Sequence, residues 1–208
     1  MVATVDTTTE GRAWGEALSA ARRVSHSKDR VGFLLCIWRA TKDPELLKEI
    51  RLAATSLDAF AGIELRVQIA LETKDPQDFE AAQEAAQESD QHRMLTAKGF
   101  AEGGNIEWAR ILAGEITSPY WLTNTLGAIA KATRKPEDFA AVLTAVKRIT
   151  GFNDNFGLSL QDMELGDLVG IWVRLDELDP AQKAAEMIFD SLPRANAFIS
   201  IAQALAKT

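Results

Sequence analysis

Thr41-Lys42-Asp43-Pro44-Glu45 is a phrase that this chain uses again as Thr73-Lys74-Asp75-Pro76-Gln77 and as Thr133-Arg134-Lys135-Pro136-Glu137. The three prolines lie 32 and then 60 residues apart, which is about one period and then two. A copy that lacks proline is therefore expected near residue 106, within Gly103-Gly104-Asn105-Ile106-Glu107-Trp108. Self-similarity at a fixed period of this length is typical of repeat architectures, in which each repeat is one supersecondary element.

Each copy of the phrase is expected to start a helix. An Asp directly before a Pro can accept a hydrogen bond from a free backbone N–H, and the Pro gives up a donor that has no partner at the first helical position. Behind the third copy, apolar side chains recur at helical spacing at Phe139, Val142 and Val146. Polar breaks such as Ser118-Pro119 are then expected to cap a second helix.

The predicted fold is all-α: an α-α superhelix, or solenoid, of about six antiparallel helix pairs with a period of about 30–32 residues. Such pairs cannot bury both faces alone, so they must stack on the next pair. Residues 1–9 are expected to be a polar N-terminal tail, and residues 10–208 a single helical-repeat domain. The predicted repeats are 11–40, 41–72, 73–104, 105–132, 133–177 and 178–208.

An inserted loop is expected near residues 150–165, because the fifth repeat is long and this stretch is rich in Gly and Asn. Its Asn153-Asp154-Asn155 cluster, with Asp162 and Glu164, offers oxygen ligands of the kind that Ca²⁺ prefers. The alternation and the terminal Glu of a calcium loop are missing, however. We therefore interpret the insertion as a turn that exposes Phe152 and Phe156 or folds them back onto the array.

The net charge of −7 argues against nucleic acid as a partner, since phosphates usually demand a basic face. Residues 10–51 carry an excess of basic side chains, whereas residues 72–90 and 162–190 are strongly acidic. This polarity favours a partner with basic patches, and the alternative is a solvated acidic surface. No apolar run is long enough to cross a bilayer, and the first residues lack a signal core, so no membrane is expected and the predicted location is cytoplasmic.

Residues for catalysis or metal binding are not grouped in recognisable motifs. His26 and His92 stand alone, the single Cys36 lies in an apolar run that predicts burial, and no Gly-x-Ser-x-Gly elbow or phosphate loop occurs. We therefore predict no catalytic residue, no metal and no cofactor.

Aromatic side chains are the better candidates for a binding surface. Trp and Tyr supply large, rigid contacts at interfaces. The candidate partner-binding residues are Tyr120, Trp121, Trp108, Phe152 and Phe156. For the tryptophans the alternative is packing between stacked helices, an alternative that applies to Trp38, Trp108 and Trp172 in particular.

The segment Tyr120–Ala132, with its Leu126-Gly127 pair and the Pro136-Glu137-Asp138-Phe139 that follows, resembles helical repeats of the tetratricopeptide-like superfamily. The period is short for that family, and the stretch from Ser118 to Val146 is also similar to short HEAT-like repeats. The resemblance covers most of residues 29–150. It implies a superhelix that binds a peptide or protein on its concave side.

The predicted function is that of a non-catalytic interaction module or scaffold, which binds a peptide or partner protein in a concave groove. One alternative is an enzyme or small-ligand binder on the same scaffold. Another is a self-assembling structural protein that forms a homo-oligomer through the C-terminal helix. This helix is expected to have an apolar stripe that no later repeat covers, formed by Phe198, Ile201, Ala202 and Leu205.

Overall fold

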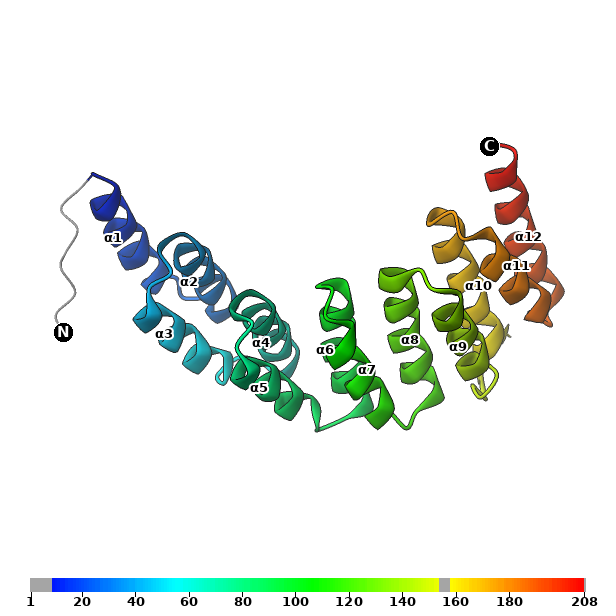
Figure 1. Cartoon of the computed structure of the whole chain (residues 1–208), viewed down its shortest axis with the longest axis horizontal. Coiled ribbons are helices and arrows are strands. Elements are labelled where there is room, and N and C mark those ends of the chain that lie inside the picture. Colours follow the sequence, from blue (N-terminus) through cyan, green and yellow to red (C-terminus); the bar gives the residue numbers. More distant parts are fainter. Residues whose placement is uncertain (1–8, 154–157, 208) are drawn as a thin grey trace. The chain divides into compact units, whose positions relative to one another are not determined.

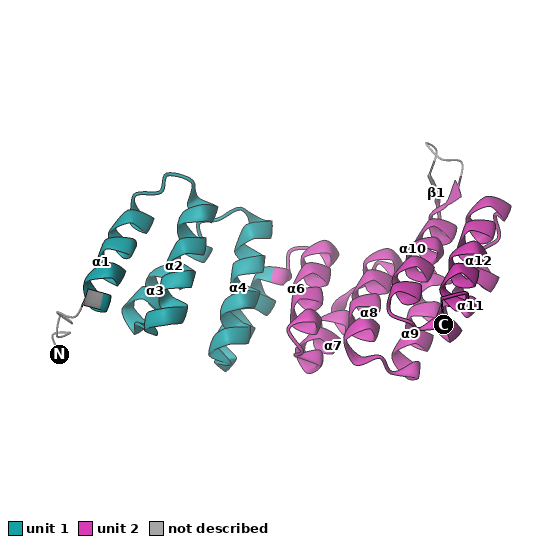
Figure 2. Cartoon of the chain, turned by 90° about the horizontal axis from the view of Figure 1, so that it is seen from above, with its two compact units in different colours: residues 1–85 teal, residues 86–208 magenta. Residues whose placement is uncertain are grey.

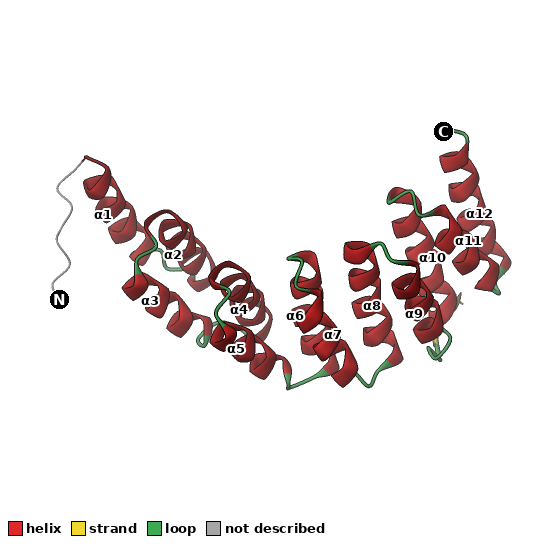
Figure 3. Cartoon of the chain, in the orientation of Figure 1, coloured by secondary structure: helices red, strands yellow, loops and turns green. Residues whose placement is uncertain are grey.

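The computed structural model describes residues 9–153 and 158–207, and these residues are almost entirely helical (Figures 1 and 3). The twelve helices in this part of the chain are α1 (Thr9–Arg22), α2 (Ser27–Thr41), α3 (Pro44–Ala54), α4 (Ala59–Thr73), α5 (Pro76–Ala86), α6 (Asp90–Glu102), α7 (Ile106–Glu115), α8 (Pro119–Thr133), α9 (Pro136–Val146), α10 (Leu160–Arg174), α11 (Leu178–Met187) and α12 (Ser191–Leu205). In sequence order, two helices correspond to each of the six predicted repeats, and consecutive helices such as α3 and α4 or α8 and α9 pack together. The all-α, stacked-pair prediction is confirmed.

The odd-numbered helices from α3 to α11, here called the first helices, all start in the same way. They begin at Pro44, Pro76, Ile106, Pro136 and Leu178. The residue two positions before each start has a positive φ: Lys42 (53°), Lys74 (56°), Gly104 (83°), Arg134 (54°) and Asp176 (62°). A left-handed residue just past a helix C-terminus lets its N–H reach the last free carbonyls, as Lys42 does to Trp38. The copy without proline thus starts at Ile106 as predicted, and the last first helix starts at Leu178, the predicted start of the sixth repeat.

The threonine and aspartate of the phrase make the bonds that fix this turn. The Thr73 hydroxyl oxygen lies 3.0 Å from the carbonyl oxygen of Ile69 and accepts a hydrogen bond from the N–H of Asp75 (3.2 Å). The Asp75 carboxylate then accepts from the N–H of Gln77 (3.1 Å), which is the expected N-terminal cap. Thr41 and Asp43 make the equivalent bonds. The same side chains therefore end one helix and begin the next.

The chain divides into two compact units, residues 1–85 and residues 86–208 (Figure 2). In the first unit, the largest fully buried side chains include Leu34, Ile50 and Ile69, which belong to α2, α3 and α4. In the second unit, Trp172 and Val142 are fully buried in a separate core. The expectation of a single domain stays a prediction.

Within the second unit, α6 packs on α8 and α10 packs on α12, while the first helices α9 and α11 contact each other. The predicted insertion lies between α9 and α10. Its described ends form a short antiparallel ladder of β1 (Phe152–Asn153) and β2 (Leu158–Ser159). Helix α10 starts directly after it, where the Ser159 hydroxyl accepts from the N–H of Asp162 (2.9 Å). The loop prediction therefore extended too far, because residues 160–165 are already helical.

Two local predictions were wrong. The Ser118 side chain makes no capping bond in α8. Instead, the carboxylate of Asp90, one repeat earlier, accepts from the N–H groups of Thr117 (3.1 Å) and Ser118 (2.7 Å). Cys36 is exposed, because its α2 neighbours Leu35 and Ile37 take the buried positions on either side of it.

Candidate functional site

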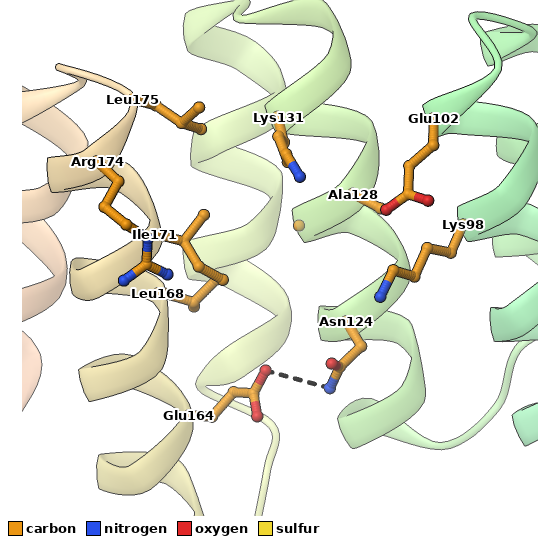
Figure 4. A pocket seen from close by; sticks show the side chains of 11 residues that line it. Lys98, Glu102, Asn124, Ala128, Lys131, Glu164, Leu168, Ile171, Arg174 and Leu175 are labelled. Carbon is orange, nitrogen blue, oxygen red and sulfur yellow. Dashed lines mark hydrogen bonds between the residues drawn. The ribbon is translucent and has the colours of Figure 1, made fainter.

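A cavity in the second unit lies between the even-numbered, or second, helices α6, α8 and α10 (Figure 4). Its volume is about 340 Å³. We call it the α8–α10 pocket. Helix α6 contributes Lys98 and Glu102 to its lining, α8 contributes Asn124, Gly127, Ala128 and Lys131, and α10 contributes Glu164, Leu168, Ile171 and Arg174. Leu175, directly after α10, completes the lining.

Helical spacing brings these side chains together. Asn124, Ala128 and Lys131 are separated by four and three residues, so they share one face of α8. Leu168, Ile171 and Leu175 follow the same spacing along α10. The backbones of α8 and α10, which the insertion separates in sequence, approach each other less closely than those of α6 and α8. The gap that remains is the pocket.

A glycine helps to keep the pocket open. A Cβ atom at Gly127 would meet Leu168 Cδ2 at 3.6 Å, which is an ordinary contact distance. A longer side chain at this position would enter the space between α8 and α10 and fill part of it. The apolar floor of the pocket comes from Ala128, Leu168 and Ile171.

Glu164 has a strongly raised pKa. Its Oε1 accepts a hydrogen bond from Asn124 Nδ2 (3.1 Å), drawn as a dashed line in Figure 4. Asn124 Nδ2 also donates to the Tyr120 carbonyl (3.1 Å), which fixes the amide at the first turns of α8. Burial raises the pKa of Glu164 to about 7, with a further contribution from the charge of Asp167, while the bond from Asn124 acts in the opposite direction. Near neutral pH this carboxyl is therefore protonated in about half of the molecules.

The pocket also contains three cations, one from each helix: Lys98, Lys131 and Arg174. All three are exposed, and in the described part of the chain none of them forms an ion pair with a carboxylate within 4.0 Å. Figure 4 shows the amine of Lys98 directed toward the space between α6 and α10. Glu102 is the remaining charged residue of the lining. The pocket therefore combines an apolar floor with an excess of positive charge.

The sequence-predicted aromatic residues lie elsewhere. Tyr120 and Trp121 occupy the first turn of α8 with their rings edge to face, 4.8 Å between centroids, and Tyr120 is 40% exposed. Trp108 is half-buried on α7, where its ring is tilted against Phe100 at 6.4 Å. None of these three lines the α8–α10 pocket.

The other two candidates are only partly described. Phe152 pairs through its backbone with Ser159 in the β1–β2 ladder, and its side chain is not among the described ones. Phe156 lies outside the described residues. The structure thus brings together Tyr120 and Trp121, while the partner-binding role of all five residues stays a prediction.

The residues that line the pocket were missed because none belongs to a motif. Asn124 and Lys131 are polar residues at helical spacing within the mostly apolar and small sequence of α8, which is the one signal that could have been followed. Glu164 was noted only beside Asp162. In the structure, Asp162 instead binds the N–H groups of Phe189 (3.0 Å) and Asp190 (2.9 Å), whereas Glu164 faces the pocket.

Among the described residues, no group of three or more His, Cys, Asp or Glu side chains is arranged to hold a metal ion. The helices in this part of the chain are also too short or too polar for a bilayer span. No protein-family model matches the chain, and comparison with curated proteins and with solved structures gave no significant match.

Proposed function

We propose that residues 86–208 act as a protein-binding module that holds a segment of a partner protein in the α8–α10 pocket and catalyses no reaction on it. The observation that supports this proposal is the pocket itself: an apolar floor bordered by three cations that have no carboxylate partner within the described residues. Apolar surface with a few convergent polar groups is what ligand sites generally offer. The exposed cations at its border make it accessible to a chain segment from solution.

An enzyme or small-ligand binder is the second candidate, and Glu164 is the observation that favours it. A carboxyl with a pKa of about 7 suits a general acid or base. Acid–base chemistry also needs a second reactive group within hydrogen-bond reach, and the hydrogen-bond partner of Glu164 is the amide of Asn124, which cannot exchange a proton usefully. Native mass spectrometry separates the two candidates, because a small-molecule site would retain its ligand in the purified chain.

Self-association through α12 is a further hypothesis. This helix and the residues before it expose large apolar side chains, namely Phe189 (93%), Leu192 (67%), Ile199 (54%) and Leu205 (56%). Apolar side chains in such number are typical of interaction surfaces. Light scattering after size exclusion at low and high salt tests this hypothesis, since a monomer under all conditions contradicts it.

Site-specific photo-crosslinking tests the proposed module. We place p-benzoylphenylalanine at Leu175, which lines the pocket and is not one of its cations, and in a matched chain at Lys147, an exposed lysine of the same unit that does not line it. A partner protein should crosslink at position 175 and not at position 147. The adduct should disappear when Gly127→Leu fills the pocket while circular dichroism shows an intact fold. Equal crosslinking at both positions, or none at either, contradicts the proposal.

A further inference from the structure

Five arginines among the described residues form an ion pair with an acidic side chain, whereas the cations of the pocket form none. The paired arginines and their partners are Arg22 with Glu49, Arg39 with Glu72, Arg51 with Asp78, Arg93 with Asp90, and Arg110 with Asp138. In contrast, Lys98, Lys131 and Arg174 come from three helices to one cavity without such a partner among the described residues. The chain supplies cations here and leaves the anion to be provided by something else.

The charged groups around the pocket come from all three helices that line it. Helix α6 contributes Lys98 and Glu102, α8 contributes Lys131 and the neutral Asn124, and α10 contributes Arg174 together with the exposed Asp167. With Glu164 protonated, the lining of the pocket has two net positive charges. Ionisation of Glu164 removes one of them, so the protonated pocket attracts an anion more strongly.

Protonated Glu164 also changes the hydrogen bonds that the pocket can make. An ionised carboxylate only accepts, whereas the protonated form has an O–H that donates. Two carboxyl groups at close range cannot both ionise easily, and they share one proton instead. A carboxylate that enters the pocket would therefore both accept the Glu164 proton in a hydrogen bond and keep Glu164 protonated.

We infer that the partner segment is acidic, with carboxylates that bind Lys98, Lys131 and Arg174, an apolar side chain that covers Leu168 and Ile171, and a hydrogen bond from protonated Glu164. This inference rests on the proposed function and names the chemistry of its partner. It departs from the basic partner expected from the net charge of the whole chain, because the local charge of the pocket is opposite to that of the chain. A cavity of about 340 Å³ is within the range of about 300–1,000 Å³ for small ligands, which is enough for a short stretch of side chains.

Fluorescence anisotropy with two end-blocked, rhodamine-labelled peptides tests the inference on the full chain. One peptide places Leu between two pairs of Glu, and the other replaces each Glu by Gln. The Glu peptide should bind about tenfold more tightly or better at low salt, because each charge-assisted bond is worth roughly twice a neutral one. Lys131→Gln and Lys98→Gln should each weaken this binding several-fold, whereas Lys147→Gln, outside the pocket, should leave it unchanged.

The pH dependence adds a readout that general charge attraction does not produce. If binding requires protonated Glu164, affinity should be about tenfold lower at pH 8 than at pH 6, as follows from a pKa of about 7. Glu164→Gln keeps a neutral donor, so it should retain binding at pH 6 and lose the pH dependence.

Three results would overturn the acidic-segment inference. The first is equal affinity for the two peptides, the second is a loss of affinity in Lys147→Gln as large as in Lys131→Gln, and the third is a constant affinity from pH 6 to pH 8. The proposed function has its own readout in the crosslinking at position 175. If adducts form there but the Glu peptide does not bind, the module stands and the inference about its partner fails. If neither is observed, both fail.

Discussion

The guanidinium of Arg51 on α3 donates two hydrogen bonds to the carboxylate of Asp78 on α5, with Nε 2.8 Å from Oδ1 and Nη2 2.6 Å from Oδ2. The Thr73 hydroxyl donates a third bond to Asp78 Oδ2 (2.6 Å). The second unit contains the same kind of link between α7 and α9. There Arg110 Nη2 donates to both oxygens of the Asp138 carboxylate (2.8 and 3.0 Å), and the Thr133 hydroxyl donates to Asp138 Oδ2 (2.6 Å). Successive first helices are thus joined by an Arg–Asp pair that the threonine of the repeated phrase completes.

Removal of Asp78 should destabilise the first unit. Asp78 is buried, and its loss removes two bonds from Arg51 and one from Thr73, while Arg51 keeps the longer bond to Asp75 (3.2 Å). Breaking a buried pair costs about 3–5 kcal/mol, and we expect about 2–3 kcal/mol for Asp78→Ala because Arg51 is partly exposed and can regain water. Urea denaturation followed by circular dichroism measures this loss. Glu80→Ala, an exposed change on the same helix, is the control, and a loss as large as that of Asp78→Ala would show that the pair contributes nothing specific.

A second link between repeats depends on Asp90. Burial alone would raise the pKa of Asp90, but bonds from the N–H of Ser118, from Thr117 and from Arg93 outweigh burial and lower it. A lowered pKa in the folded state means that the contribution to stability is present above the unfolded pKa and is lost as pH falls through the folded one. Asp90→Asn should therefore cost about 1–2 kcal/mol at pH 7 and much less near pH 3. The same penalty at both pH values would contradict this account, and Glu107→Gln on the exposed face of α7 is the matched control.

The helices and their starts could be predicted because local chemistry determines them. The phrase around Pro44 contains its own cap, its own left-handed residue and its own helix start, all within five residues. Even the copy without proline was placed correctly at Ile106, since a period can be extrapolated across a degenerate copy. The predicted sixth repeat also begins at residue 178, where α11 starts, although its Pro180 lies at the third helical position rather than the first.

The links and the pocket could not be predicted, because they join side chains about one repeat or more apart. Asp90 looks like an ordinary first-turn acid of α6, yet its carboxylate caps the turn before α8, 27 and 28 residues on. Asn124 and Glu164 meet across 40 residues that include the insertion. Such contacts depend on how far each helix pair rotates against the next. The apolar periodicity of a single helix does not specify that rotation.

Two helical glycines should respond in opposite directions to alanine. At Gly127 a Cβ would have an ordinary contact with Leu168, so Gly127→Ala should stabilise the chain by about 0.5–1 kcal/mol through helix propensity. At Gly62 a Cβ would lie 2.9 Å from the backbone oxygen of Ala54, which cannot move away without disturbing the end of α3. Gly62→Ala should therefore destabilise despite the same gain in propensity. The midpoints of urea unfolding compare the two, and a shift of the same sign in both would refute the packing argument.

Alanine substitutions at Trp172 and Trp121 should have different effects on stability, because Trp172 packs in the core and Trp121 lies nearer the surface. Trp172 is fully buried against Phe139, with the rings edge to face at 5.4 Å, so Trp172→Ala should cost about 3–5 kcal/mol. Trp172→Phe should cost less than about 1.5 kcal/mol, because the buried indole N–H has no hydrogen-bond partner to lose. Trp121 is only half-buried, and we expect about 1–2 kcal/mol for Trp121→Ala. Loss of the crosslinked partner with an intact fold would support Trp121 as an anchor, whereas a thermal shift as large as that of Trp172→Ala would assign it to the core.

Glu164 should make the second unit less stable as the pH rises. Its pKa is raised from the ordinary 4.5 to about 7, so between these values the unfolded chain has lost the proton that the folded chain keeps. Since the folded state then binds more protons than the unfolded state, stability falls with pH across this interval and is constant above it. Glu164→Gln removes the group that titrates. At pH 8 the variant should be more stable than the parent chain by about 1 kcal/mol, a value that allows for the partial exposure of Glu164 to solvent. Near pH 4.5 the two chains should be equally stable.

Urea denaturation at the two pH values measures this difference, and a carbon-13 titration of the Glu164 carboxyl observes the proton directly. Glu137→Gln, at an exposed acid of α9, serves as the control, because it removes an acid that lies outside the pocket. A pH-independent effect of Glu164→Gln would mean that the pKa of Glu164 is the same in the folded and the unfolded chain, so that Glu164 is ionised near neutral pH. The neutral donor that the acidic partner is inferred to require would then not exist, so this measurement on the free chain also tests the basis of that inference.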